Sequence, residues 1–342
     1  MIRRRRASRS PLSLLALTAV VVWDASSVRA QQTVPARSAE GSADRSTDGA
    51  RLFEAGRFSE ARVALSAHAA ARPDDPVPPF YLGRIAMLDG DFEAAARLLE
   101  RASKLDDRNA RYHSWLGRAL GQQAVRGSKL KAPFVAKRAK LELERAVALD
   151  TDDVDARLAL VQFYLVAPGM VGGSVNRARA HAAEVATRSP FGGHMASAWI
   201  AEDRKDFGAA EQAYRAAMAA YPDSTDAAYG LGLLYGRMGD TEKAFAILEE
   251  LVAAHPASTK ALYAIGRLGA ETGQRLERAE AALRAYLDAP RREGNPPLAS
   301  AHYRLGMVHE RKGDRARARE EYGASLRLEK RGEVKEALAR VR

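Results

Sequence analysis

A repeating pattern of about 34 residues runs through most of this 342-residue chain and limits its fold more than any other feature. The stretches Gly56 to Leu65 and Gly90 to Leu99 carry glycine, phenylalanine, alanine and leucine in the same order, 34 positions apart. The alanine of this pattern returns at Ala61, Ala95, Ala139, Ala178, Ala210, Ala244, Ala279 and Ala318. Such a period is typical of a solenoid, in which each unit contacts mainly its neighbours.

Each period predicts two amphipathic helices joined by a short turn. An apolar residue followed by glycine keeps the same phase in the first helices, at Leu82-Gly83, Leu116-Gly117, Leu231-Gly232, Ile265-Gly266 and Leu305-Gly306. These glycines and the repeated alanines are small enough for two helices to cross closely. A second set of glycines is expected in the turns within pairs, where a left-handed backbone is needed: Gly56, Gly90, Gly239, Gly273 and Gly313.

The pattern resembles the tetratricopeptide repeat family, which combines an apolar-glycine step with a later alanine, an aromatic residue or leucine, and a terminal proline. The resemblance covers roughly Asp44 to Glu329 and includes eight candidate repeats. It implies an all-α, right-handed superhelical solenoid of about eight helix pairs over residues 49–331. Residues 332–342 are expected to form a capping helix with a solvent-facing side. The family's signature residues serve packing, so the resemblance implies a protein-interaction module and names no partner.

The N-terminus has the pattern of a cleavable secretory signal over residues 1–30. Arg3 to Arg6 provide a positive segment, Leu12 to Trp23 an apolar stretch, and Ala30 a small residue before the expected cleavage point. A membrane anchor is the competing interpretation, but 12 helical residues rise about 18 Å against a hydrocarbon core of about 30 Å. Residues 31–48 lack apolar periodicity and are expected to be a flexible lead-in. The sequence therefore predicts a periplasmic or secreted protein.

Composition removes several classes of function. The chain has no cysteine, which excludes disulfides, thiolate metal sites and cysteine nucleophiles. Of the net charge of +11, the first 30 residues contribute +5, and the remaining +6 is spread over a surface of mixed sign. Without a dense basic patch, this balance disfavours nucleic-acid binding.

Three insertions interrupt the period, near residues 122–133, 168–174 and 291–297. From Gly121 to Leu141 the first carries no acid and six basic residues: Arg126, Lys129, Lys131, Lys137, Arg138 and Lys140. This basic insertion is suited to an anionic surface such as lipid headgroups or lipopolysaccharide, although ordinary helical surface pairing also explains it. In the second, the sequence APG-x-x-GGS resembles a variation of exported bacterial members of the family. A packed elbow with Ser174 as N-cap is favoured there over an anion site.

The first helices are expected to line a concave groove. Residues two positions before each apolar-glycine step give aromatic side chains at Phe80, Tyr229, Tyr263 and Tyr303, with Ser114 at the remaining slot. One turn further on lie Arg84, Arg118 and Arg267. Aromatic rings beside guanidinium groups can bind a peptide through apolar, cation–π and carboxylate contacts. The alternative is that these rings only cover neighbouring helices.

No catalytic residue, cofactor site or metal site is predicted. The seven histidines show no metal-binding spacing, and no nucleophile elbow, phosphate loop or dinucleotide fingerprint occurs. The clustered carboxylates from Asp150 to Asp155 are better explained as helix caps. The sequence thus predicts a non-catalytic scaffold that binds a protein or peptide in its groove. The alternative is a binder of an anionic envelope component through the basic insertion.

Overall fold

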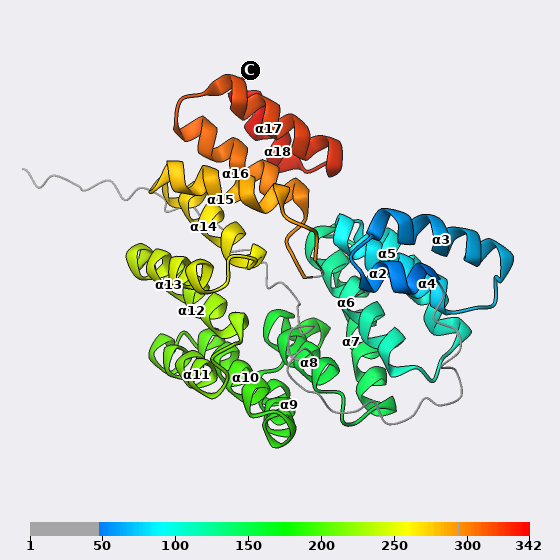
Figure 1. Cartoon of the computed structure of the whole chain (residues 1–342). Coiled ribbons are helices and arrows are strands. Elements are labelled where there is room, and N and C mark those ends of the chain that lie inside the picture. The colour runs from blue at the N-terminus through cyan, green and yellow to red at the C-terminus, as the bar shows by residue number, and fades with distance from the viewer. Residues whose placement is uncertain (1–47, 293) are drawn as a thin grey trace, which may run out of the picture.

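The computed structural model describes residues 48–292 and 294–342, which form α-helices and one short 3-10 turn, η1 (Figure 1). The elements are α2 (Asp48–Glu54), α3 (Phe58–Ala71), α4 (Val77–Asp89), α5 (Phe92–Leu105), α6 (Ala110–Arg126), α7 (Ala132–Leu149), α8 (Val154–Val166), η1 (Gly169–Val171), α9 (Val175–Arg188), α10 (Pro190–Asp203), α11 (Phe207–Ala220), α12 (Thr225–Met238), α13 (Thr241–Ala254), α14 (Thr259–Thr272), α15 (Leu276–Asp288), α16 (Leu298–Arg311), α17 (Arg315–Leu328) and α18 (Gly332–Arg340). None of these helices is long and apolar enough to cross a membrane.

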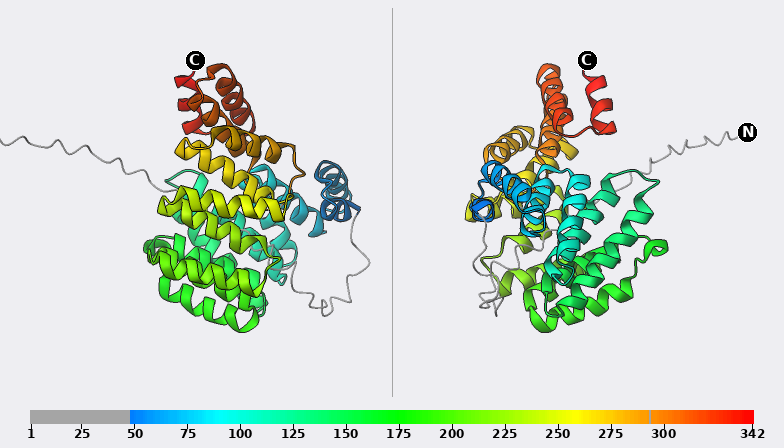
Figure 2. Two further views of the ribbon diagram at one scale, coloured as in Figure 1. Left: turned by 60° about the vertical axis from the view of Figure 1, so that its left-hand side comes forward. Right: turned by 90° about the vertical axis from the view of Figure 1, so that its right-hand side faces the viewer.

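Consecutive helices pack as eight pairs, from α2 with α3 to α16 with α17. The pairs stack one on the next, as both views of Figure 2 show. The first helices of successive pairs also contact each other, as α8 does with α10 and α14 with α16. They therefore lie on the inside of the curve, and the surface they form is called the inner surface below. The predicted all-α solenoid is confirmed.

The repeated small residues make close packing possible within each pair. All eight alanines of the pattern, from Ala61 to Ala318, are fully buried. In the five apolar-glycine steps, the glycine faces a large side chain four residues after that alanine. A Cβ atom on Gly83 would lie 2.6 Å from Cγ of Leu99, and one on Gly266 would lie 2.3 Å from Cγ of Leu283. Any side chain at these positions would force the helices apart.

The turns within pairs have the expected left-handed backbone. Gly56, Gly90, Gly239, Gly273 and Gly313 all have φ between 74° and 80°. In the pair α10–α11 a lysine, Lys205, takes this conformation with φ of 60°. Lysine tolerates it less well than glycine, so the fifth pair keeps the turn geometry at a local cost.

Short polar side chains cap the N-termini of several helices, and the sequence predicted this for α8 and α9. Ser174 accepts a hydrogen bond from the backbone N–H of Arg177 at 3.4 Å and caps α9. Asp153 caps α8 in the same way, through the N–H of Ala156 at 3.0 Å. These bonds satisfy donors that a helix start leaves open, which explains part of the carboxylate cluster between α7 and α8.

Helix α18 covers the end of the last pair. Val334, Ala337 and Val341 form a small buried cluster with Ala318 and Tyr322 of α17. Lys335, Glu336 and Arg340 remain exposed on the other side of this helix. The final helix therefore closes the apolar end of the stack and presents a polar face to water.

The array curves so far that its second pair meets its seventh and eighth (Figure 1). Arg291, in the loop before α16, forms an ion pair of 2.8 Å with Asp89 at the end of α4, although 202 positions separate them. A Cβ on Gly90 would lie 3.2 Å from the ring of Pro297. The third insertion therefore makes a contact between distant repeats, and its described residues 289–292 and 294–297 are named the closing loop.

Candidate functional site

An accessible cluster of aromatic and basic side chains lies on the inner surface, on α12 and α14. Burial raises the pKa of the Tyr229 hydroxyl, and the charges of Arg267 and Lys260 lower it in part. Lys260 also forms an ion pair of 3.2 Å with Asp226 on α12. Tyr229 and Arg267 are each partly exposed. No hydrogen bond or ion pair of Arg267 occurs within residues 48–292 and 294–342.

Four of the seven predicted groove residues are instead buried between helices. Phe80 is 1% exposed, and its ring packs 4.9 Å from that of Tyr112 on α6. Tyr263 is 7% exposed and packs 5.3 Å from Tyr286 on α15. The prediction that these two rings face a ligand is wrong, because neighbouring repeats use them as packing surface.

Arg84 and Arg118 also join repeats. The Arg84 guanidinium lies within 5.4 Å of the ring centres of four aromatic residues and 3.3 Å from a carboxylate oxygen of Glu54. Arg118 donates a hydrogen bond of 3.1 Å to the main-chain oxygen of Asp155 at the start of α8. Both arginines are 4% exposed. The prediction that they contact a ligand is therefore wrong in this structure, since each bridges adjacent pairs.

Tyr303 is partly exposed near the C-terminal end, where its ring lies 5.8 Å from that of Tyr322. Arg304, beside it, forms an ion pair of 3.0 Å with Glu271 on α14. Of the seven predicted groove residues, Tyr229, Arg267 and Tyr303 thus remain partly exposed, the last near the end of the array. Fewer of the predicted groove residues reach the surface than the sequence indicated.

Two further aromatic side chains of the first helices were not among the predicted groove residues. Tyr81 and Trp115 are partly exposed and stand immediately before the apolar-glycine steps of α4 and α6. The slot used in the prediction lies one residue earlier. Consecutive residues of a helix differ by about 100° in direction, so both can border the same surface. Including the residue directly before each apolar-glycine step would therefore have identified these two side chains.

The basic insertion divides into structural and exposed cations. Arg126 lies 5.1 Å over the ring of Phe92 and 3.8 Å from Glu329 after α17, and its burial lowers its pKa. Arg138 pairs with Glu100 of α5 at 3.1 Å. Lys140 extends over Gly172 in the next loop. Arg126 therefore serves packing, whereas Lys129, Lys131, Lys137 and Arg138 are exposed. Contact of this insertion with an anionic partner stays a prediction.

The second insertion is a tightly packed elbow. Val171 is 4% exposed, and the N–H of Ser174 donates a bond of 2.9 Å to the carbonyl of Tyr164. A Cβ on Gly173 would lie 1.7 Å from the carbonyl oxygen of Ala167. Only glycine fits there, so the glycines serve backbone packing, as the favoured interpretation held.

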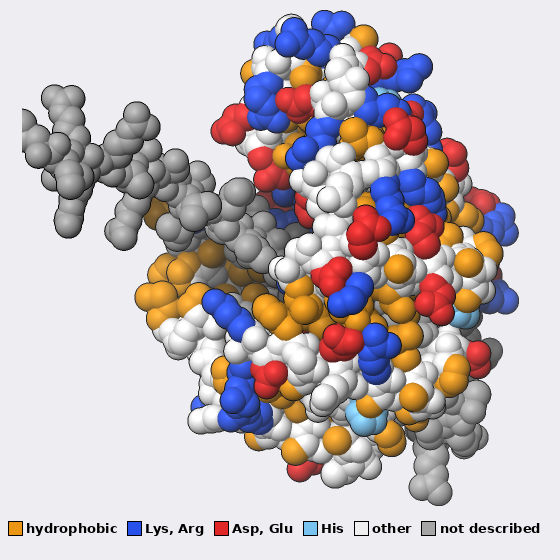
Figure 3. All heavy atoms as spheres, turned by 90° about the vertical axis from the view of Figure 1, so that its left-hand side faces the viewer, with side chains coloured by type: hydrophobic (Ala, Val, Ile, Leu, Met, Phe, Trp, Pro, Cys, Tyr) orange, Lys and Arg blue, Asp and Glu red, His pale blue; other side chains and the backbone are white. Residues whose placement is uncertain are grey.

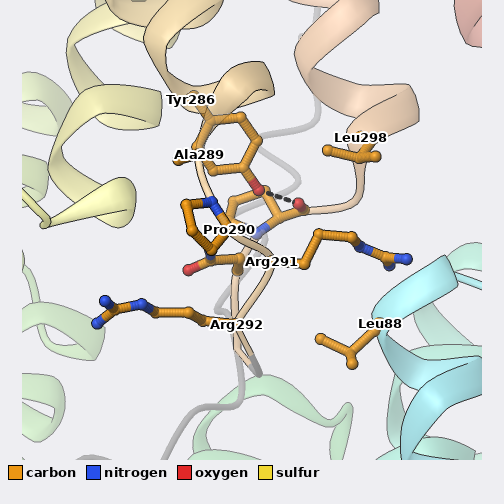
Figure 4. A pocket seen from close by; sticks show the side chains of 9 residues that line it. Leu88, Tyr286, Ala289, Pro290, Arg291, Arg292 and Leu298 are labelled. Atoms are coloured by element: carbon orange, nitrogen blue, oxygen red, sulfur yellow. Dashed lines mark hydrogen bonds between the residues drawn. The ribbon is translucent and has the colours of Figure 1, made fainter. Parts of the chain in front are cut away.

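The closing loop borders a shallow pocket (Figure 4). The Tyr286 hydroxyl donates a hydrogen bond to the carbonyl of Pro296 across this pocket. Leu88 of α4 and Leu298 of α16 both line it. The hydrogen bond and the apolar contacts together hold the closing loop against α4.

Charges of both signs are interspersed over the face drawn in Figure 3. Many of them pair between neighbouring repeats, as Arg278 does with Glu249 at 2.8 Å. Exposed pairs of this kind contribute little stability each. The mixed surface agrees with the charge balance of the sequence.

The histidines lie in packing or pairing positions. His302 forms a 2.7 Å contact with Glu321, and His113 one of 2.6 Å with Glu142. Within the described ranges, no group of three or more His, Asp or Glu side chains has the geometry of a metal site.

His309 is expected to make stability depend on pH. It is 1% exposed, and both ring nitrogens lack a hydrogen-bond partner. Burial lowers its pKa, so the folded chain prefers the neutral ring. The free energy of unfolding should therefore be highest above the ordinary histidine pKa of about 6.5 and fall as the pH drops through and below that value. Chemical denaturation at a series of pH values between about 8 and 5, roughly the titration range of histidine, measures this change in the free energy of unfolding. His309→Leu should flatten the fall, and an unaltered slope in that variant would contradict the assignment.

Family models of the tetratricopeptide repeat match residues 52–119, 201–268 and 299–331. No curated protein matches the chain. Three similar solved structures are a tetratricopeptide repeat protein from Parabacteroides merdae, the APC/C hetero-tetramer Cut9-Hcn1, and YrrB, described as a tetratricopeptide repeat protein with an unusual peptide-binding site.

The first is 15% identical with a TM-score of 0.45, and the match covers 78% of this chain and 98% of that one. Cut9-Hcn1 is 15% identical with a TM-score of 0.46, and the match covers 83% of this chain and 52% of that one. YrrB is 17% identical with a TM-score of 0.34, and the match covers 72% of this chain and 98% of that one. The family models fall on helix pairs that carry five of the eight repeated alanines. Residues 52–119, 201–268 and 299–331 of this all-α solenoid therefore match tetratricopeptide repeats.

Proposed function

We propose that the chain is a non-catalytic interaction module of the bacterial envelope that binds a protein or peptide on its inner surface. The carrying observation is that Tyr229 on α12 and Arg267 on α14, two inner helices that contact each other, are both partly exposed. Tyrosine supplies a large rigid contact and arginine a planar donor for carboxylates, the combination that dominates binding energy at protein interfaces. Solenoids of this kind use their concave side for such contacts.

Salt dependence of partner binding distinguishes this proposal from the alternative, in which the basic insertion binds an anionic envelope component. A partner captured from envelope extract by the whole chain should remain bound at about 0.5 M salt, where charge attraction reaches only roughly 4 Å. Contact through Lys129, Lys131 and Lys137 should weaken steeply over the same range. A partner lost at moderate salt would count against the inner surface.

The proposed envelope location rests on the leader over residues 1–30, which lies outside the described residues. Export should remove this segment close to Ala30, because the apolar stretch is short and ends near small residues. Intact mass and N-terminal sequencing of the protein recovered from the envelope check this. Retention of Met1 there would indicate an anchor instead.

A further inference from the structure

The turn between α6 and α7 exposes apolar side chains that a soluble repeat would normally cover. Leu130 is 87% exposed and Phe134 is 74% exposed, while Val125 at the end of α6 is 48% exposed. α6 and α7 have 17 and 18 residues, longer than the 13 or 14 of the later helices such as α14 and α15. The extra length carries this turn, here named the tip (residues 125–137), away from the shared packing of the pairs.

The tip is an ordered turn. The N–H groups of Lys131 and Ala132 both donate to the carbonyl of Ser128 at 3.0 Å. The N–H of Phe134 donates to the carbonyl of Lys131 at 3.1 Å, and a proline stands in the first turn of α7. Leu130 and Phe134 are thus held at one end of the hairpin by backbone bonds.

Exposed cations surround these apolar side chains. Lys129 and Lys131 flank Leu130 in the sequence, and Lys137 lies three residues after Phe134, on the same side of α7. All three are exposed, and no acid occurs between Gly121 and Leu141. The tip therefore combines an apolar centre with a positive rim.

We propose that the tip binds the surface of an anionic lipid bilayer, a function separate from that of the inner surface. Leu130 and Phe134 enter the boundary between headgroups and acyl chains, while Lys129, Lys131 and Lys137 meet lipid phosphates. Apolar side chains with a lysine rim are the features that hold peripheral proteins at such interfaces. A soluble polyanion would engage the lysines but leave Leu130 and Phe134 in water, so the bilayer fits the tip better.

The absence of cysteine allows a local test in the full chain. Leu130→Cys introduces one thiol, which carries an environment-sensitive fluorophore, and Val63→Cys on α3 provides a matched control because Val63 is 73% exposed. The probes are vesicles of phosphatidylglycerol mixed with phosphatidylcholine, and vesicles of phosphatidylcholine alone. The label at position 130 should shift to shorter wavelength and brighten with the anionic vesicles only. The label at position 63 should not respond.

Replacing the three lysines by glutamine should raise the lipid concentration for half-maximal signal at position 130 at least tenfold, since each lysine contributes several-fold near an anionic surface. Lys243→Gln on α13, an exposed lysine elsewhere, should leave it unaltered. A label at position 130 that stays in water while the protein sediments with anionic vesicles would overturn the proposal. Equal responses to both vesicle types, or no effect of the triple variant, would overturn it as well.

Discussion

Gly232→Leu is expected to lower the free energy of unfolding by about 1–3 kcal/mol, the usual effect of overpacking a close helix contact. A Cβ atom at Gly232 would lie 2.7 Å from both Cγ and Cδ2 of Leu248 and 3.1 Å from Cγ2 of Ile247. Both neighbours are on α13, the partner helix of the pair. The leucine can be accommodated only if α12 and α13 separate, and that separation also disturbs the adjoining pairs.

Chemical denaturation followed by circular dichroism measures this effect. Gly208→Leu is the matched control, because Gly208 is exposed at the start of α11 and a Cβ there would meet only a carboxylate oxygen of Asp206 at 4.0 Å. The control should be neutral or slightly stabilising, since leucine favours helix over glycine. Equal midpoints for the two variants would mean that Gly232 does not lie at a helix crossing.

The fold could be predicted from local sequence because each repeat solves the same packing problem. An alanine with no room for a larger side chain recurs at each crossing, and the structure buries all eight. The glycine turns followed similarly, since a left-handed backbone leaves few choices of residue. The left-handed backbone of Lys205 could not be predicted, because the surrounding structure imposes it against the usual preference of lysine.

The site was harder to predict because burial on the inner surface depends on how far successive pairs rotate. Phe80 and Tyr229 occupy equivalent slots, yet the first is enclosed by α6 and the second remains accessible. The contact of Arg291 with Asp89 depends on curvature summed over several pairs. The spacing of residues along the chain does not give this accumulated curvature. The closing loop was therefore visible in the sequence only as an irregular interval between repeats.

Replacing Tyr229 and Arg267 together by alanine should weaken a partner bound on the inner surface by about 2 kcal/mol or more, roughly a thirtyfold change in affinity. The two side chains lie on the contacting inner helices α12 and α14, and each is partly exposed. Tyr263 stays in place, because its ring is 7% exposed and packs against Tyr286. Its loss would destabilise the fold and obscure the binding effect.

Phe134→Ala combined with Lys137→Ala provides a control of the same kind, an aromatic residue and a cation removed at the tip. These side chains are exposed, so the control should retain both fold and partner affinity. Circular dichroism confirms that all proteins keep their helices. Loss of affinity in the control alone would assign the partner to the tip.

The dissociation constant of the captured partner for the Tyr229→Ala, Arg267→Ala variant therefore tests the proposed binding surface most directly. An increase of about thirtyfold in a folded variant, with the tip control unaltered, is the predicted result. A dissociation constant equal to that of the unmodified chain would contradict a binding site on α12 and α14.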